Sequence, residues 1–217
     1  MPPSREPAGN QPDLVVVPAV TAGGDNNRVG VAVLLPVKAF RHAKARLAPA
    51  LDPYDRAALA RDMATKVVRA AGELPVAVVC DDDEVSAWAA TLGAEVIWRP
   101  GRGLNAAVAD GVDELAVLGY ERVIVAHADL PHALDLTWVA DFDGVTLVPD
   151  RRDDGTNVAS VPTRSGFEFA YGPGSFARHQ AEAARRGLAL RVEREVRLGW
   201  DVDTPDDLIR PDWLAAR

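Results

Sequence analysis

The sequence predicts an α/β fold built on a mostly parallel sheet. Short apolar runs typical of buried strands alternate along the chain with segments of helical periodicity. The run at residues 123–126 leads to Asp129, and Pro131 prevents further strand pairing. A chain of 217 residues with 48% hydrophobic content can form a real core. We expect a poorly ordered tail over residues 1–28 and one domain over residues 29–217.

The composition excludes several classes of protein. There are 24 Lys and Arg against 32 Asp and Glu, and a net charge of −8 argues against a nucleic-acid or anionic-membrane partner. The single Cys80 excludes an internal disulfide and fits a reducing compartment. No apolar run approaches the roughly 18 residues of a membrane helix. The apolar island at residues 14–17 is too short for a signal peptide, although an extra edge strand there stays open. We expect a cytoplasmic protein.

A basic segment follows the first predicted strand, residues 31–35. Five cationic positions occur within nine residues of an otherwise acidic chain. The position directly after a strand favours a phosphate-binding loop. A solvated basic helix face is the alternative. The cationic residues are Lys38, Arg41, His42, Lys44 and Arg46.

Next, a helix is expected after Asp52, which suits the N-cap, with Pro53 at the first helical position. A four-residue apolar repeat gives the helix its buried face, and Gly72 ends it. Residues 76–79 form the next predicted strand. Because alternating strands and helices of this kind build parallel sheets, this unit supports the predicted fold class.

Three consecutive acids, Asp81, Asp82 and Asp83, follow that strand. Three carboxylates at a strand end could hold a metal. A helical pattern starts immediately at Val85, however, and acids are favoured in the first turn of a helix. We therefore favour a capping role over a metal site. The next predicted strand is residues 95–98.

A glycine-rich turn at residues 99–105 opens a predicted helix over residues 106–118. Such a turn suits an anion or the polar edge of a base. It lacks the spacing of either standard glycine fingerprint, so this signal is weak. Asn105 as a plain helix cap is the alternative.

Asp129 is the leading candidate for a metal-holding residue. In an open parallel sheet, ligands collect at the carboxyl ends of the strands, where Asp129 is expected. The alternative is that Asp129 only caps the short helix that the spacing of Leu134 and Trp138 predicts.

In the second half, strands are expected at residues 145–148 and 158–161, and a tight turn at residues 171–175 leads into a helix. Free backbone amides at Gly174 and Ser175, with the Ser175 hydroxyl, would form a nest for a carboxylate or phosphate. Ser175 as a plain N-cap is the alternative, and both can hold together.

The last informative stretch starts a short helix at Thr204 and Pro205, with two acids in its first turn. Asp201 and Asp203 have no such local role, and in an extended chain they point to the same side. Paired acids of this kind suggest ligands of a divalent metal.

Five motifs, taken together and in this order, resemble the guanylyltransferase family of coenzyme F420 biosynthesis. That family includes 2-phospho-L-lactate guanylyltransferase and its phosphoenolpyruvate-using relatives. The resemblance covers residues 31–208. The motifs are Val33-Leu34-Leu35-Pro36-Val37-Lys38, Ala128-Asp129-Leu130-Pro131, Gly155-Thr156-Asn157, Tyr171-Gly172-Pro173-Gly174-Ser175-Phe176 and Asp201-Val202-Asp203-Thr204-Pro205.

The resemblance implies a Rossmann-like three-layer sandwich of the nucleotide-diphospho-sugar transferase type. It also implies site residues, with Lys38 counted among the catalytic ones. The implied Mg²⁺ ligands are Asp129 and Asp203, the implied residues for the phosphorylated acid are Thr156, Gly172 and Ser175, and the implied nucleotide-binding residues are Pro36, Lys38, Lys44, Gly103 and Asn105.

The implied reaction transfers GMP from GTP to phosphoenolpyruvate or 2-phospho-L-lactate and releases pyrophosphate. The product would pass to a transferase that uses a deazaflavin acceptor. Composition typical of a high-GC bacterium favours phosphoenolpyruvate. Alternatives are another acceptor such as 3-phosphoglycerate, a non-catalytic GTP-binding module, or a metal hydrolase built on His127, Asp129 and His132.

Overall fold

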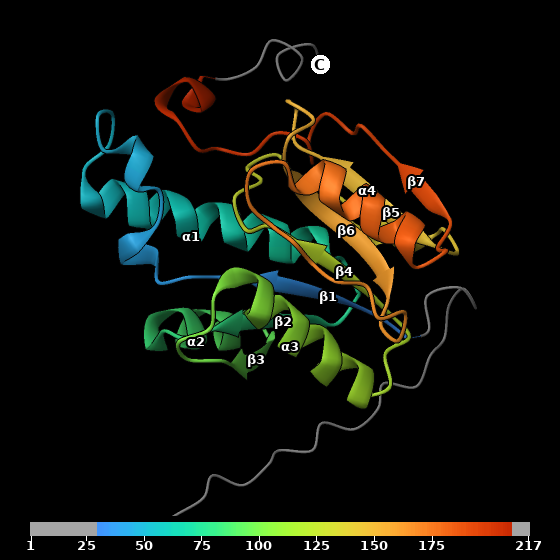
Figure 1. The fold of residues 1–217 in the computed structure, drawn as a ribbon. Helices are drawn as coiled ribbons and strands as arrows, with labels where there is room; N and C mark the ends of the chain where they lie inside the picture. Colours follow the sequence, from blue (N-terminus) through green and yellow to red (C-terminus); the bar gives the residue numbers. More distant parts are fainter. Residues whose placement is uncertain (1–29, 210–217) are drawn as a thin grey trace, which may run out of the picture.

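A computed structural model describes residues 30–209, so the predicted tail lies outside the described residues. They form one seven-stranded sheet with the strand order β3-β2-β1-β4-β6-β5-β7 (Figure 1). Every neighbouring pair is parallel except the two made by β6. The predicted α/β class is confirmed. The strands are β1 (Val31–Pro36), β2 (Val76–Cys80), β3 (Glu95–Trp98), β4 (Arg122–Ala126), β5 (Val145–Pro149), β6 (Thr156–Pro162) and β7 (Leu190–Val192).

Helices cover both faces of the sheet. Helices α1 and α2 pack in one hydrophobic cluster, and α3 and α4 pack in another. Side chains of β1 alternate between them, since Val33 belongs to the first cluster and Leu34 to the second. The helices are α1 (Pro53–Ala70), α2 (Asp83–Thr91), α3 (Leu104–Val117) and α4 (Ser175–Arg185), and the 3-10 helices are η1 (Phe40–His42), η2 (Ala45–Leu47), η3 (Thr137–Ala140) and η4 (Pro205–Leu208).

The strand order places a switch point between β1 and β4. β1 pairs with β2 on one side and with β4 on the other, both in parallel. The chain therefore leaves β1, β2 and β4 at the same edge of the sheet, where ligands of open α/β folds bind.

Close packing of α3 on β1 fixes one wall of this edge. A Cβ atom built on Gly111 would lie 2.8 Å from a methyl carbon of Leu34, so only glycine fits without a shift. Helix α3 is thereby held close against β1.

Several predicted caps are confirmed. Asp52 accepts a hydrogen bond from the Asp55 amide at 2.8 Å, with Pro53 in the first turn. Asp82 caps α2 by accepting from the amides of Glu84 and Val85. The capping interpretation of the triple-acid stretch therefore holds for its middle residue.

Two cap predictions are wrong. Helix α3 begins at Leu104 with Gly103 as N-cap, so Asn105 lies inside the first turn. Helix α4 begins at Ser175, and its N-cap is Gly174, whose φ of +71° is a left-handed conformation that glycine adopts readily. The short edge strand β7 was not predicted, because three residues carry too little pattern.

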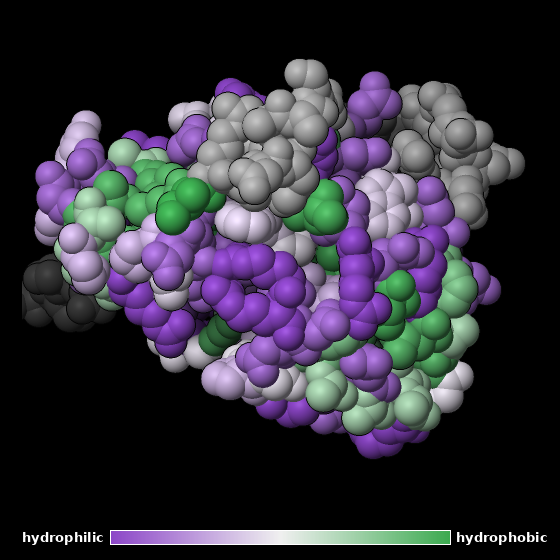
Figure 2. Space-filling view, turned by 90° about the horizontal axis from the view of Figure 1, so that it is seen from above, coloured by the Kyte–Doolittle hydropathy of each residue, from purple (hydrophilic) through white to green (hydrophobic). Residues whose placement is uncertain are grey.

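On the face shown in Figure 2, hydrophilic residues predominate and hydrophobic ones form several smaller groups. In residues 30–209 no helix is both long and apolar enough to cross a membrane.

Candidate active site

Asp129 and Asp203 meet at the carboxyl edge of the sheet, as predicted. The ammonium of Lys44 lies between them, with its Nζ 2.6 Å from Asp129 Oδ2 and 3.1 Å from Asp203 Oδ1. The two segments are also joined directly, because the Val202 amide donates to the Asp129 carbonyl at 3.3 Å. The site is thus assembled from the loops after β1 and β4 and from the C-terminal segment.

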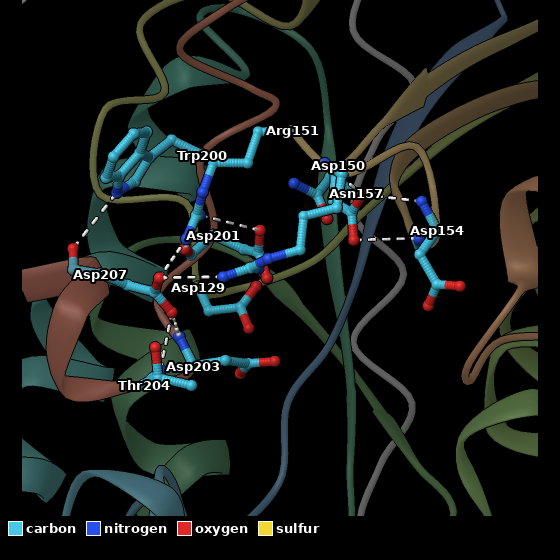
Figure 3. Close-up of polar contacts among 12 residues, drawn as sticks. Asp129, Asp150, Arg151, Asp154, Asn157, Trp200, Asp201, Asp203, Thr204 and Asp207 are labelled. Atoms are coloured by element: carbon cyan, nitrogen blue, oxygen red, sulfur yellow. Dashed lines mark hydrogen bonds and ion pairs between the residues drawn. The ribbon is translucent and has the colours of Figure 1, made fainter. Parts of the chain in front are cut away.

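A third carboxylate, Asp201, completes what we call the acidic cluster: Asp129, Asp201 and Asp203 (Figure 3). Asp129 Oδ1 and Asp201 Oδ1 are buried and have no hydrogen-bond partner. Buried carboxylate oxygens without a partner are costly unless a ligand satisfies them, and carboxylates suit hard divalent cations. These donor atoms fit such a cation. No group of three or more such side chains in residues 30–209 already has the arrangement of a metal site.

Charges set the protonation of the cluster. Burial opposes ionisation of Asp129, but the neighbouring Lys44 outweighs it and the pKa of Asp129 lies below its usual value. Burial, with the charges of Asp129 and Asp203, raises the pKa of Asp201. Burial would lower the pKa of Lys44, yet the two carboxylates hold it above its usual value. Lys44 therefore stays charged.

Asp207 holds the backbone of the acidic cluster in place. Its Oδ2 accepts from the amides of Asp203 at 2.8 Å and Thr204 at 2.7 Å, and its Oδ1 pairs with Arg151. Burial works against its charge, but these donors lower the pKa of Asp207 to about 2. The sequence predicts for Asp207 only a place in the first turn of a short helix, and its support of Asp203 was not predicted.

Arg151 links the same segments from the loop between β5 and β6. It donates to the Asp201 carbonyl at 3.0 Å, and its guanidinium lies 4.3 Å from the centre of the Trp200 ring (Figure 3). No local sequence signal pairs a loop arginine with residues about fifty positions away, so Arg151 was also missed.

The basic segment after β1 is not a helix face. It consists of two 3-10 turns anchored by the buried Phe40 and Leu47, with Lys44 between them at a φ of +56°. Arg41 turns away to pair with Asp82, and Lys38 is exposed at the end of β1. The left-handed backbone at Lys44 is unusual for a side-chain-bearing residue and accompanies its position between the two carboxylates.

A second group lies where β6 begins. We call Thr156, Ser175 and His179 the Thr156 group. The Thr156 amide donates to Ser175 Oγ at 3.0 Å, and His179 Nδ1 lies 3.0 Å from Thr156 Oγ1. The Ala170 amide donates to His179 Nε2 at 2.9 Å, so Nε2 is the acceptor and Nδ1 carries the proton. The Thr156 hydroxyl therefore accepts from His179 and keeps its own hydrogen free to donate.

Backbone pairing brings this group beside the acidic cluster. β6 runs antiparallel to β4, and the His127 amide donates to the Asn157 carbonyl at 2.9 Å. Thr156 thus lies next to the chain that carries Asp129.

The predicted nest of free amides is wrong. The Gly174 amide donates to Asp154 Oδ1 at 3.1 Å, and the Ser175 amide donates to the Gly172 carbonyl at 3.0 Å. Ser175 is not the N-cap either, since its hydroxyl oxygen serves Thr156. An acid that binds here must use the hydroxyls or displace Asp154.

Asn105 also has a local partner. Its Oδ1 accepts from the Tyr171 amide at 2.7 Å, and its Nδ2 lies 3.4 Å from the Tyr171 carbonyl. Asn105 thereby fixes the turn that precedes α4. Its predicted contact with guanine, like that of Gly103, stays a prediction.

The alternative histidine cluster gains no support. The His127 ring lies against Tyr171, with centroids 4.9 Å apart, and the His132 ring faces Trp200 at 6.4 Å. With Asp129 they are not arranged as a metal site within the described part of the chain.

Comparisons with known proteins agree with this geometry. The sequence profile of the family described as "Guanylyl transferase CofC like" matches residues 31–210. A phosphoenolpyruvate guanylyltransferase of Sphaerobacter thermophilus is 39% identical, covering 81% of this chain and 89% of the relative. A 2-phospho-L-lactate guanylyltransferase of Methanocaldococcus fervens is 31% identical, covering 81% and 82%.

Solved structures show the same fold. A protein of Desulfovibrio desulfuricans assigned to the nucleotide-diphospho-sugar transferases has a TM-score of 0.64 at 17% identity, covering 81% of this chain and 83% of its own. A nucleotidyl transferase of Methanothermobacter has a TM-score of 0.59 at 15% identity, covering 84% and 95%.

Proposed function

The chain belongs to the CofC-like guanylyl transferase family and is a nucleotidyltransferase, and from this premise we propose that it transfers GMP from GTP to phosphoenolpyruvate. Pyrophosphate is the other product. The activated acid is a precursor in coenzyme F420 biosynthesis and passes to a transferase with a deazaflavin acceptor.

The observation that carries the proposal is the acidic cluster. Three carboxylates from two distant segments converge beside a basic loop, and two of their buried oxygens have no hydrogen-bond partner. A nucleotidyl transfer must bring two mutually repelling anions together, which requires positive charge between them. The cluster suits Mg²⁺ held by Asp129 and Asp203, with Asp201 beside them.

The reaction requires little proton transfer by protein side chains. The nucleophile is a phosphate oxygen of the acid, and a phosphomonoester with a second pKa of about 6 is already largely ionised at neutral pH. No general base is needed. When bound, a divalent cation would neutralise charge on the attacking and leaving oxygens.

The other role of the protein is to orient the two substrates. Lys44, held charged at the acidic cluster, and Lys38, exposed at the end of β1, face the edge where the triphosphate would lie, with Pro36 beside them. The Thr156 and Ser175 hydroxyls, with Gly172, would orient the acid. Asp207 keeps Asp203 in place through two amide hydrogen bonds.

The relatives of known activity limit the choice of the acid that accepts GMP. Both phosphoenolpyruvate and 2-phospho-L-lactate enzymes match, and the phosphoenolpyruvate enzyme of Sphaerobacter has the higher identity of the two compared above. 3-Phosphoglycerate is the second candidate class. These acids differ by small groups that a few contacts can distinguish.

The test is pyrophosphate release from GTP and Mg²⁺ with each of the three acids in turn, with the deazaflavin acceptor and its transferase present to consume the product. We expect release with phosphoenolpyruvate and none without an acid. Release of pyrophosphate only with one of the other acids would identify that acid as the acceptor. GTP binding without release under any condition would identify a non-catalytic module and refute the proposal.

A further inference from the structure

A small hollow lies at the carboxyl ends of β1 and β2, and no residue of the acidic cluster lines it. Its enclosed volume is only about 50 Å³ and the hollow is open to solvent, so a ring that binds here would lie partly in the opening. Its walls come from the ends of β1 and β2, from the turn after β3 and from the first turn of α3.

The hollow has apolar and polar sides. Val79, Leu104 and Ala107 supply apolar surface, and charged side chains complete the lining. An apolar wall with a few polar groups suits a flat aromatic ring that carries hydrogen-bonding edges. The charged lining residues are Lys38, Asp81, Arg99 and Arg102.

Asp81 is the one carboxylate in this lining, and it has no structural task. Asp82, the next residue, caps α2 and pairs with Arg41. The exposed Asp81 carboxylate makes no hydrogen bond or ion pair within residues 30–209. The arginines, in contrast, are engaged, since Arg99 pairs with Glu114 and Arg102 with Asp110.

We propose that this hollow binds the guanine base and that Asp81 selects guanine by accepting hydrogen bonds from its N1–H and 2-amino groups. A carboxylate offers two acceptors and no donor, and guanine presents two adjacent donors on that edge. Adenine presents an acceptor at N1 and has no 2-amino group, so Asp81 would disfavour it. The assignment rests on the proposed guanylyl transfer and adds the residue that determines nucleotide specificity.

The strand order supports this direction of binding. The order β2-β1-β4 places the hollow and Asp129 on opposite sides of β1, and β2 lies two strand spacings, about 10 Å, from β4. A nucleotide with its base between β1 and β2 would run its phosphates past Lys38 toward Lys44 and the acidic cluster. Different residues would therefore contact the base and the phosphates, except at the end of β1, which lies beside both.

The experiment compares wild type with Asp81→Asn, and uses Asp83→Asn as the matched control. Asp83 carries the same charge two residues away, is exposed, and lies outside the hollow. We would measure kcat/KM for GTP, ITP and XTP by pyrophosphate release. ITP lacks the 2-amino group, and XTP has an oxygen in its place.

Wild type and Asp83→Asn should prefer GTP over ITP by about 10- to 100-fold, the value of a charge-assisted hydrogen bond. In Asp81→Asn that preference should disappear, and XTP should improve relative to GTP because the amide can donate to its oxygen. Equal losses with GTP and ITP, an identical effect of Asp83→Asn, or a wild type indifferent to the 2-amino group would each overturn the assignment.

Direct binding separates this proposal from the proposed function. Calorimetry of GDP and IDP with the same three proteins needs no turnover. A GDP preference that depends on Asp81 would support the base site even if no acid were found to react. Turnover with GTP but no such preference would leave guanylyl transfer intact and refute the role of Asp81.

Discussion

The acidic cluster and the Thr156 group lie at neighbouring strand ends but are built in opposite ways. The cluster is charged, it contains two buried oxygens without a hydrogen-bond partner, and Lys44 places a positive charge between Asp129 and Asp203. In the Thr156 group, both ring nitrogens of His179 and the hydroxyl oxygens of Thr156 and Ser175 are hydrogen-bonded within the protein.

The difference separates two kinds of ligand site. An unsatisfied charged cluster is stabilised when a counter-ion binds, so its substitutions should act on the chemical step. A neutral group whose acceptor atoms already take part in hydrogen bonds is held in place before substrate binds, so its substitutions should act on substrate binding and on folding. The following predictions test this contrast.

The largest effect is expected at the acidic cluster. Asp129→Asn should lower kcat by about 1,000-fold. The side chain of residue 129 then has no negative charge with which to hold a cation between the two anionic substrates. Circular dichroism should show an intact fold. Asp141→Asn, which removes an exposed carboxylate away from the site, is the control and should keep wild-type turnover. Full activity in Asp129→Asn would refute the role of the cluster.

The next effect concerns folding and belongs to His179. Burial, with the charges of Arg178 and His127, lowers its pKa from 6.5 to about 4. The unfolded chain therefore takes up this proton at a higher pH than the folded protein. The contribution of His179 to stability is complete above pH 6.5 and is lost as the pH falls toward 4, by about 3 kcal/mol in total.

The measurement is the free energy of unfolding of wild type minus that of His179→Asn, followed from pH 7.5 to 4 by urea denaturation. Asparagine does not titrate, so groups common to both proteins cancel. A difference that stays constant across this range would show that the pKa of His179 is the same in the folded and the unfolded protein, so that burial does not lower it.

Much of the fold could be predicted from the sequence. Long elements such as α1 combine a cap, an apolar repeat and a terminating glycine, so several independent signals agree. The short β7 has only three residues, and its pairing with β5 depends on tertiary contacts. The start of α4 was misplaced because serine is a common N-cap, whereas here the left-handed Gly174 takes that position.

The site was predictable where a residue had no local task. Asp129 follows from its position after a strand and Asp203 from its lack of a local role in an extended segment, and the structure brings them together. Asp207 and Arg151 could not be found in this way. Asp207 has an obvious role in a helix turn, and nothing in the sequence reveals a second partner about fifty residues away. The role of His179 could not be predicted either, since nothing in the sequence around a histidine on a helix face indicates its contact with Thr156.

The smallest expected effect is on binding of the phosphorylated acid. If the Thr156 hydroxyl donates to the acid because His179 occupies its acceptor side, His179→Leu should raise the KM for the acid about 10-fold. The KM for GTP and kcat should change little. His179→Asn should restore binding, because an amide nitrogen can donate to Thr156 from nearly the same position as Nδ1.

A double-mutant cycle decides whether the two side chains act as one unit. Thr156→Val alone should raise the KM for the acid by a similar factor, and adding His179→Leu to it should cause little further change. Independent, multiplying effects would mean that His179 supports only the fold. An unchanged KM for the acid in Thr156→Val would show that the Thr156 hydroxyl does not bind the acid. The acidic cluster would then be a ligand site, and the Thr156 group would only stabilise the fold.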